Sequence, residues 1–167
     1  MIKIGNNLSE WSSYSCQPKT RVELQNIIWD RVSKEGPNCD LNDIDISLVT
    51  DMSYLFCESE FNGDISKWNV SNVKDMSGMF NGLDFNQDIS NWNVNNVTNM
   101  NSMFENSNFN KDISKWNTSN VTCMKWMFRN SKFNRDISNW KIRKDCATDR
   151  MFIGCPIKEE YKPKLPQ

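Results

Sequence analysis

Histidine is absent from this chain of 167 residues, and glycine and proline are scarce, with six and five residues. The first absence excludes a Ser-His-Asp hydrolase, because no imidazole is present to act as the base. No Gly-rich loop that could cradle a phosphate is found either. Catalysis by paired carboxylates is not excluded by the residue types. We expect no enzyme, because the aspartates recur at a fixed spacing whereas an active site occurs once.

Long hydrophobic runs are also missing. No stretch approaches the roughly 20 apolar residues of a membrane-spanning helix, and residues 1–7 lack the features of a secretion signal. We therefore expect a cytoplasmic protein without a membrane span. The formal net charge of −1 makes nucleic acid and anionic membranes poor partners for the chain as a whole.

The six cysteines never form the spacing Cys-x-x-Cys that is typical of zinc sites. A zinc site would need four thiolates from distant segments, and disulfides would need an oxidising compartment. Both alternatives stay open, and we expect free thiols that serve packing. The sequence therefore predicts neither a bound metal nor a cofactor.

What the chain has instead is a period of 24 residues. Phenylalanine, aspartate, tryptophan and methionine each recur at this spacing, which is typical of proteins built from stacked repeats. The recurring residues are Phe61, Phe85, Phe109 and Phe133; Asp64, Asp88, Asp112 and Asp136; Trp68, Trp92, Trp116 and Trp140; and Met79, Met103, Met127 and Met151, each followed by Phe.

The period predicts an α/β repeat solenoid of the leucine-rich-repeat-like type, with about five coils over residues 37–156. We expect one short parallel strand per coil at the segment Asp-Ile-Ser-x-Trp, because its isoleucine recurs and neighbouring coils would pair it. The motif Val-x-x-Met-x-x-Met-Phe spaces apolar residues by three and favours a short helical turn on the far side. Isoleucine, tryptophan, valine, methionine and phenylalanine then fill the interior.

Both ends of the repeats are expected to be capped. Residues 1–36 form the N-terminal cap, anchored by Trp11 and Tyr14, with a helix at about 20–35 that opens with a capping box at Thr20 and Glu23. Residues 157–167 form a C-terminal capping tail.

The repeat Phe-Asn-x-Asp-Ile-Ser-x-Trp-Asn-Val-Ser-Asn-Val-x-x-Met-x-x-Met-Phe resembles the BspA-like, Mycoplasma-type leucine-rich-repeat-like surface proteins. The segments Cys39–Ile44 and Gly154–Tyr161 look like that family too. The resemblance implies a repeat domain that binds proteins or surface ligands, without catalytic residues. It also implies that a location at the cell surface is possible.

The aspartate column is one candidate site. Carboxylates stacked about 5 Å apart repel each other unless something neutralises them. Calcium is one answer, and hydrogen bonding to turn amides and to the serine two residues on is the other. We expect the second, because calcium-binding repeats bring several acids per turn.

Charge is unevenly distributed along the repeats. Residues 37–60 hold six acids and no base, whereas residues 109–132 hold five bases and one acid. A solvated surface, an acidic partner and head-to-tail self-association are the three interpretations. The position before Met-Phe adds two aromatic side chains to this pattern, and there Trp126 and Tyr54 act as interface anchors or pack on neighbouring segments. The candidate protein-binding residues are Trp126, Lys111, Lys115, Lys125, Arg129, Arg135 and Tyr54.

We therefore predict a non-enzymatic protein-binding module, a small intracellular adaptor or inhibitor that meets an acidic partner through its basic C-terminal coils. A monomer is favoured. Adhesin-type ligand binding at the cell surface and a structural or assembly role are alternatives. Binding of single-stranded nucleic acid is a third, and it is disfavoured because the acidic half of the chain repels phosphate.

Overall fold

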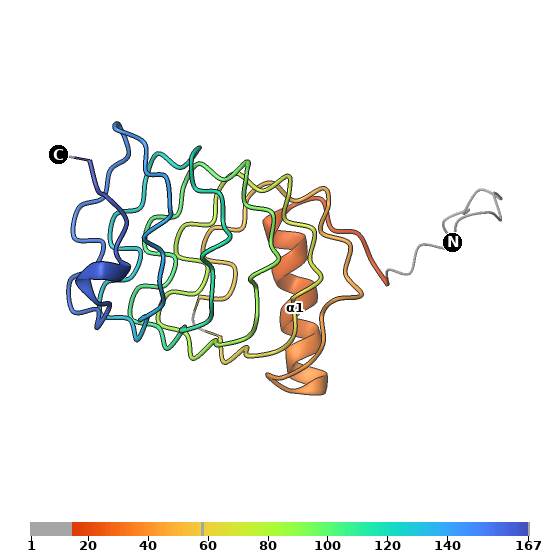
Figure 1. Ribbon diagram of the computed structural model, residues 1–167. Coiled ribbons are helices and arrows are strands. Elements are labelled where there is room, and N and C mark those ends of the chain that lie inside the picture. The colour runs from red at the N-terminus through yellow and green to blue at the C-terminus, as the bar shows by residue number, and fades with distance from the viewer. Residues whose placement is uncertain (1–14, 58, 167) are drawn as a thin grey trace, which may run out of the picture.

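The computed structural model describes residues 15–57 and 59–166 (Figure 1). Trp11 and Tyr14, the predicted anchors, lie outside the described residues. Segments of 24 residues lie side by side, with a helix at one end and the C-terminal segment at the other. These segments are named coil one (37–60), coil two (61–84), coil three (85–108), coil four (109–132) and coil five (133–156).

The helix α1, Arg21–Glu35, covers the exposed end of coil one (Figure 1). Thr20 caps it, since the Thr20 hydroxyl accepts a hydrogen bond from the Glu23 amide. Leu24 and Ile28, one turn apart, are fully buried. Burial of this apolar face against coil one holds the helix in place.

At the other end the chain forms a short 3₁₀ helix, η1, Glu159–Tyr161. The Ile137 amide donates to the Tyr161 carbonyl, and the Lys158 amide donates to the side chain of Asn134. Residues 157–161 therefore continue the first part of the repeat beyond coil five.

The predicted α/β class, with one parallel strand per coil, is wrong. The described residues form one α-helix, one 3₁₀ helix and no strand. In the described residues the β-bridges between neighbouring coils are isolated and parallel, and four of them join Asp51, Asp75, Asn99, Cys123 and Ala147 in succession. These four lie just before the methionines, and not in the predicted strand segment.

Turns replace the predicted strands for a local reason. In coils two to five the tryptophan amide donates back to the isoleucine carbonyl three residues earlier, at 3.0–3.2 Å. The aspartate before each isoleucine also accepts the amide of the following serine through its side chain. Both bonds bend the backbone, so the segment cannot extend into a strand.

The segment with the methionines is held in consecutive turns. In every coil, the residue directly before the Met-Phe pair (Leu55-Phe56 in coil one) has a positive φ, between 52° and 59°. These five residues are Tyr54, Gly78, Ser102, Trp126 and Arg150. A second column, Gly82, Asn106, Asn130 and Gly154, has φ of 55–70°. Glycine and asparagine are the residues that adopt this left-handed conformation most readily.

The core consists of columns that run through all coils. Phenylalanine rings of neighbouring coils stack, as in the pair Phe80 and Phe104 with centroids 5.5 Å apart. Each tryptophan of coils two to five donates its indole N–H to a carbonyl of the preceding coil; Trp116, for example, bonds Ile89. The isoleucine, tryptophan, valine, methionine and phenylalanine columns are buried, as the period predicts, apart from the changed positions in coil five and Phe152, which is partly buried.

Candidate functional site

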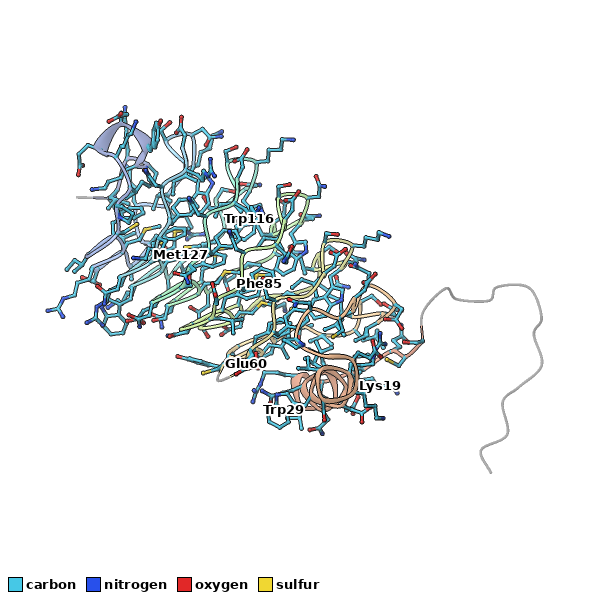
Figure 2. All side chains as sticks on the ribbon, turned by 90° about the horizontal axis from the view of Figure 1, so that it is seen from below. Lys19, Trp29, Glu60, Phe85, Trp116 and Met127 are labelled. Atoms are coloured by element: carbon cyan, nitrogen blue, oxygen red, sulfur yellow. The ribbon has the colours of Figure 1, made fainter. Side chains whose placement is uncertain are left out.

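The seven predicted binding residues fall into two sets along the coil. Lys111, Lys115 and Arg135 belong to the segment that ends at the tryptophan. Tyr54, Lys125, Trp126 and Arg129 belong to the segment with the methionines. Both segments send residues into the core, including the labelled Trp116 and Met127 in Figure 2.

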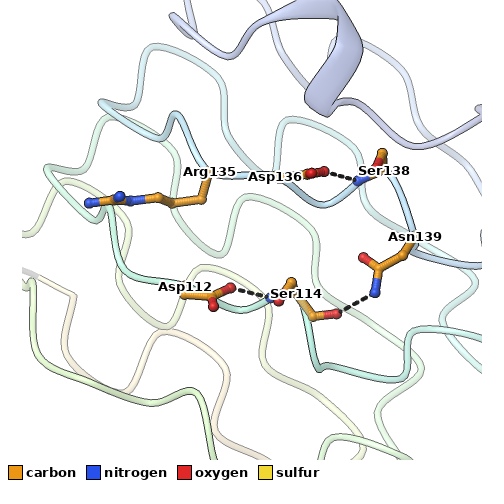
Figure 3. Close-up of a pocket in the computed structure, with 6 residues that line it drawn as sticks. All are labelled: Asp112, Ser114, Arg135, Asp136, Ser138 and Asn139. Carbon is orange, nitrogen blue, oxygen red and sulfur yellow. Dashed lines mark hydrogen bonds between the residues drawn. The ribbon is translucent and has the colours of Figure 1, made fainter.

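Arg135 of the first set lines a shallow hollow of about 440 Å³ between coils four and five. Figure 3 shows its lining, in which Arg135 extends to one side and Asn139 bonds the Ser114 carbonyl. The Arg135 side chain also donates to the Asn110 carbonyl at 2.8 Å. This bond holds the guanidinium near Asp112, whose pKa is lowered chiefly by the hydrogen bonds from Ser114 and further by the charges of Lys115 and Arg135.

The aspartate column is satisfied by the backbone. Asp64, Asp88, Asp112 and Asp136 each accept the amide of the serine two residues on, at 2.8–2.9 Å. These amide bonds are the main cause of the lowered pKa of all four carboxyl groups, because they stabilise the charged form. Within the described residues, no group of three or more acids and cysteines could hold a metal ion.

Two of the predicted basic residues are already paired inside the protein. Arg129 contacts Glu105 of coil three at 2.9 Å, and Glu105 is almost fully buried. Lys125 contacts Asp149 of coil five at 2.9 Å, and this carboxylate raises the pKa of the lysine. Both pairs link neighbouring coils, so these two charges are less available to a partner.

The aromatic members of the set differ in exposure. Tyr54 is 44% exposed, and its ring lies over Gly78, where an added Cβ would come within 2.2 Å of the ring. Trp126 is half-buried, and its buried indole N–H has no hydrogen-bond partner among the described residues. Tyr54 thus packs on coil two while it keeps one side open to solvent.

Trp29 is an exposed aromatic residue that the sequence analysis missed. It lies on α1, is 53% exposed, and borders a hollow of about 370 Å³ with Val32, Cys57 and Glu60. Figure 2 shows Trp29 beside the helix and Glu60 close to it. The sequence feature that could have indicated the exposure of Trp29 is its position outside the apolar stripe of the helix.

Unpaired positive charge is concentrated in coils four and five. Of their ten bases, Lys125, Arg129 and Arg143 form ion pairs. The other seven have no acidic partner within the described part of the chain: Lys111, Lys115, Lys132, Arg135, Lys141, Lys144 and Arg150. All but Lys111, which is half-buried, are exposed.

A family model described as "Mycoplasma protein of unknown function, DUF285" matches residues 28–108 and 97–159. The matches cover well over half of the chain and all five coils. The protein belongs to this family. The resemblance to Mycoplasma-type repeat proteins is thereby confirmed at the level of the family, whose description assigns no activity or location. No curated protein and no solved structure matches the chain.

The family match begins inside α1 and ends at the start of η1. The candidate binding residues, from Tyr54 to Arg135, therefore all lie within the family's part of the chain. No helix within the described residues is long and apolar enough to cross a membrane. All six cysteines are free, and burial raises the pKa of the Cys146 thiol to about 11.

Proposed function

We propose that this protein is a non-enzymatic binding module, an adaptor or inhibitor that recognises an acidic surface of a partner protein. The observation that carries the proposal is the set of seven bases on coils four and five that have no acidic partner in the described part of the chain. Charge of one sign on a protein surface attracts a partner of opposite charge and orients it during the encounter.

The central contact of this surface is the group Lys111, Lys115 and Arg135. Arg135 is held by the Asn110 carbonyl, which leaves less side-chain freedom to lose on binding. The aspartates between these bases are engaged with serine amides and contribute to the turns. A non-catalytic role fits this arrangement, because coils two to five all repeat the same aspartate and serine.

The test is capture of partners from a lysate of the native host by the tagged protein, identified by mass spectrometry. A triple variant, Lys111→Glu with Lys115→Glu and Arg135→Glu, should lose the partner. Lys67→Glu is the matched control, because Lys67 occupies the position of Lys115 two coils earlier. The Lys67→Glu control should retain the partner, and higher salt should weaken capture of the partner by the wild type.

Equal capture by the triple variant and the wild type would refute this surface. Thermal unfolding of both variants shows whether they are folded before the comparison is made. Trp126→Ala, analysed in the same way, reports whether the half-buried indole contributes to the contact.

Binding of a ligand at the cell surface is the second candidate, and the resemblance to BspA-like surface proteins favours it. Labelling of intact host cells with an antibody against the protein distinguishes the two. Signal on intact cells supports the surface role, whereas signal only after lysis supports an internal partner.

A further inference from the structure

Between the first methionine of each segment and the second positive-φ position, the hydrogen bonds that join neighbouring coils run in one direction. Just before that methionine they run the other way, as from the Lys74 amide to the Thr50 carbonyl. In coil four, the amides of Met124, Trp126, Phe128 and Asn130 donate to carbonyls of coil five at 2.8–3.1 Å. Coils two and three make the same four bonds to the coil that follows them. Each coil therefore presents a row of donors toward the C-terminal end of the molecule.

Coil five presents the same row, for which the described residues offer no acceptor. Its four donors are the amides of Thr148, Arg150, Phe152 and Gly154, and none has an acceptor among the described residues. The backbone nevertheless keeps the conformation of coil four, with φ of 57° at Arg150 and 70° at Gly154. The row is thus preformed.

The backbone of the C-terminal segment bonds a different part of coil five, at Ile137 and Asn134 in the first half of the coil. The Lys162 ammonium of this segment lies 5.7 Å from the centre of the Phe152 ring and offers the amide row no acceptor. Ile153, between the last two donors, stays 53% exposed. In contrast, α1 covers the opposite end of the molecule, where Gln25 donates to the Leu55 carbonyl.

The surroundings of this row are positive. Arg150 and Lys144 are exposed and have no ion pair within the described residues, whereas the nearby Asp149 is neutralised by Lys125. Successive N–H groups in alternating right- and left-handed conformation form a concave surface that attracts anions. Such a row requires a partner that offers oxygen acceptors.

We propose that the edge formed by residues 148–154 docks an extended acidic segment of a partner protein. Backbone carbonyls and carboxylates of that segment would accept the four amides, in the manner of a strand added to an open sheet edge. This inference rests on the proposed function, because it takes the partner to be acidic, and it names the edge at which the segment would lie.

A second copy of the chain fits this edge poorly. Two such edges facing each other would oppose donor to donor. The carbonyls of coil one, which continue the register, lie at the end that α1 covers. A foreign segment is therefore favoured over self-association.

The test follows backbone amide shifts of the ¹⁵N-labelled full chain during titration with a short peptide that alternates glutamate and valine. A peptide with lysine in place of each glutamate is the control. The acidic peptide should shift the amides of Thr148, Arg150, Phe152 and Gly154, and the basic peptide should leave them unchanged. Arg150→Glu should weaken binding roughly tenfold, whereas Lys74→Glu on coil two should not.

Three outcomes would overturn the docking edge. Shifts confined to Lys111, Lys115 and Arg135 would place acidic binding elsewhere, and the proposed function would stand. No shift with either peptide would remove the edge, and the capture experiment would then decide the proposed function separately. Doubling of the mass of the peptide-free protein, measured by light scattering, would show that a second copy is the occupant.

Discussion

At the scale of single residues, backbone conformation explains the most variable column of the repeat. Tyr54, Gly78, Ser102, Trp126 and Arg150 all have positive φ, so the glycine here meets a backbone requirement. In the structure, Ser102 is buried while Tyr54 is open, so exposure depends on which neighbour covers each side chain.

Alanine substitutions at Gly82 and Gly78 separate the energetic cost of a positive φ from the cost of steric overlap with a neighbouring side chain. Gly82→Ala has open space around the new methyl group, so only the positive φ opposes it, at about 1 kcal/mol of unfolding free energy. Gly78→Ala also meets the Tyr54 ring at 2.2 Å and should cost about 2–4 kcal/mol. Urea unfolding measures both.

A third variant identifies the source of the difference. Tyr54→Ala removes the overlap, so the addition of Gly78→Ala to the Tyr54→Ala variant should cost about as much as Gly82→Ala does in the wild type. Equal effects of Gly78→Ala with and without Tyr54 would contradict the role of the ring.

The two ion pairs between coils should differ in importance. Arg129→Met leaves the buried Glu105 carboxylate without its partner, which should lower the unfolding free energy by about 1–3 kcal/mol. Lys125→Met removes a pair that is open to solvent, so its stability should stay close to wild type. Parallel denaturant titrations of the two variants provide the check, and a larger loss for Lys125→Met would rule out this ranking.

At the scale of the element, the local structure that recurs in every coil is the turn. Each coil is bent by side chains that accept amides two residues on, as Asp88 does from Ser90 and Asn93 from Asn95. Asparagine and aspartate are abundant because these turns recur in coil after coil. The helix α1 has a different task, since it buries Leu24 and Ile28 over an end that no coil covers.

The aspartate turns make stability depend on pH. Their carboxyl groups have a lowered pKa in the folded protein, because the charged form accepts the serine amides. The stabilisation is present above the ordinary aspartate pKa of about 4 and is lost as pH falls through the lowered folded pKa values. Thermal unfolding midpoints should therefore fall with pH below about 4.

Asparagine substitution tests the cause of this dependence. Asp88→Asn together with Asp112→Asn keeps the amide acceptor but removes the titrating group. The variant should lose less stability than the wild type between neutral and acidic pH. An unchanged pH profile would mean that other carboxyl groups control acid unfolding.

At the scale of the whole molecule, contacts run between neighbouring coils. Tryptophan and asparagine side chains and the directional amide bonds each join one coil to the next, as Trp116 joins Ile89. Cohesion is therefore local along the stack, and the ends are the special places. One end carries α1, and the other carries the open amide row of coil five.

This locality predicts that one whole period can be removed. Deletion of residues 85–108 joins Asp84 to Phe109, which has the same place in the coil as Phe85. The shortened chain should fold with lower stability and keep a cooperative transition in circular dichroism. Deletion of residues 85–96, half a period, should abolish folding because every later column loses its register.

Much of the core could be predicted from the 24-residue period alone. A side chain that recurs at one place in every coil must meet its own copies, so the phenylalanine, tryptophan and isoleucine columns were assigned to the interior. The strands were predicted wrongly, because isoleucine and tryptophan favour extended backbone only when nothing local competes. Here the aspartate turn and the hydrogen bond from the Trp92 amide to the Ile89 carbonyl bend the backbone and prevent an extended strand.

The candidate site was less predictable, because charge in the sequence does not reveal pairing. Lys125 and Arg129 count as free bases until Asp149 and Glu105, one coil away, are seen beside them. The sequence by itself determined the period, the buried columns and the concentration of bases in coils four and five, since all three follow from residue type and spacing. Only the tertiary structure decided which charges are neutralised and which amides of coil five stay open, because both depend on what lies in the neighbouring coil.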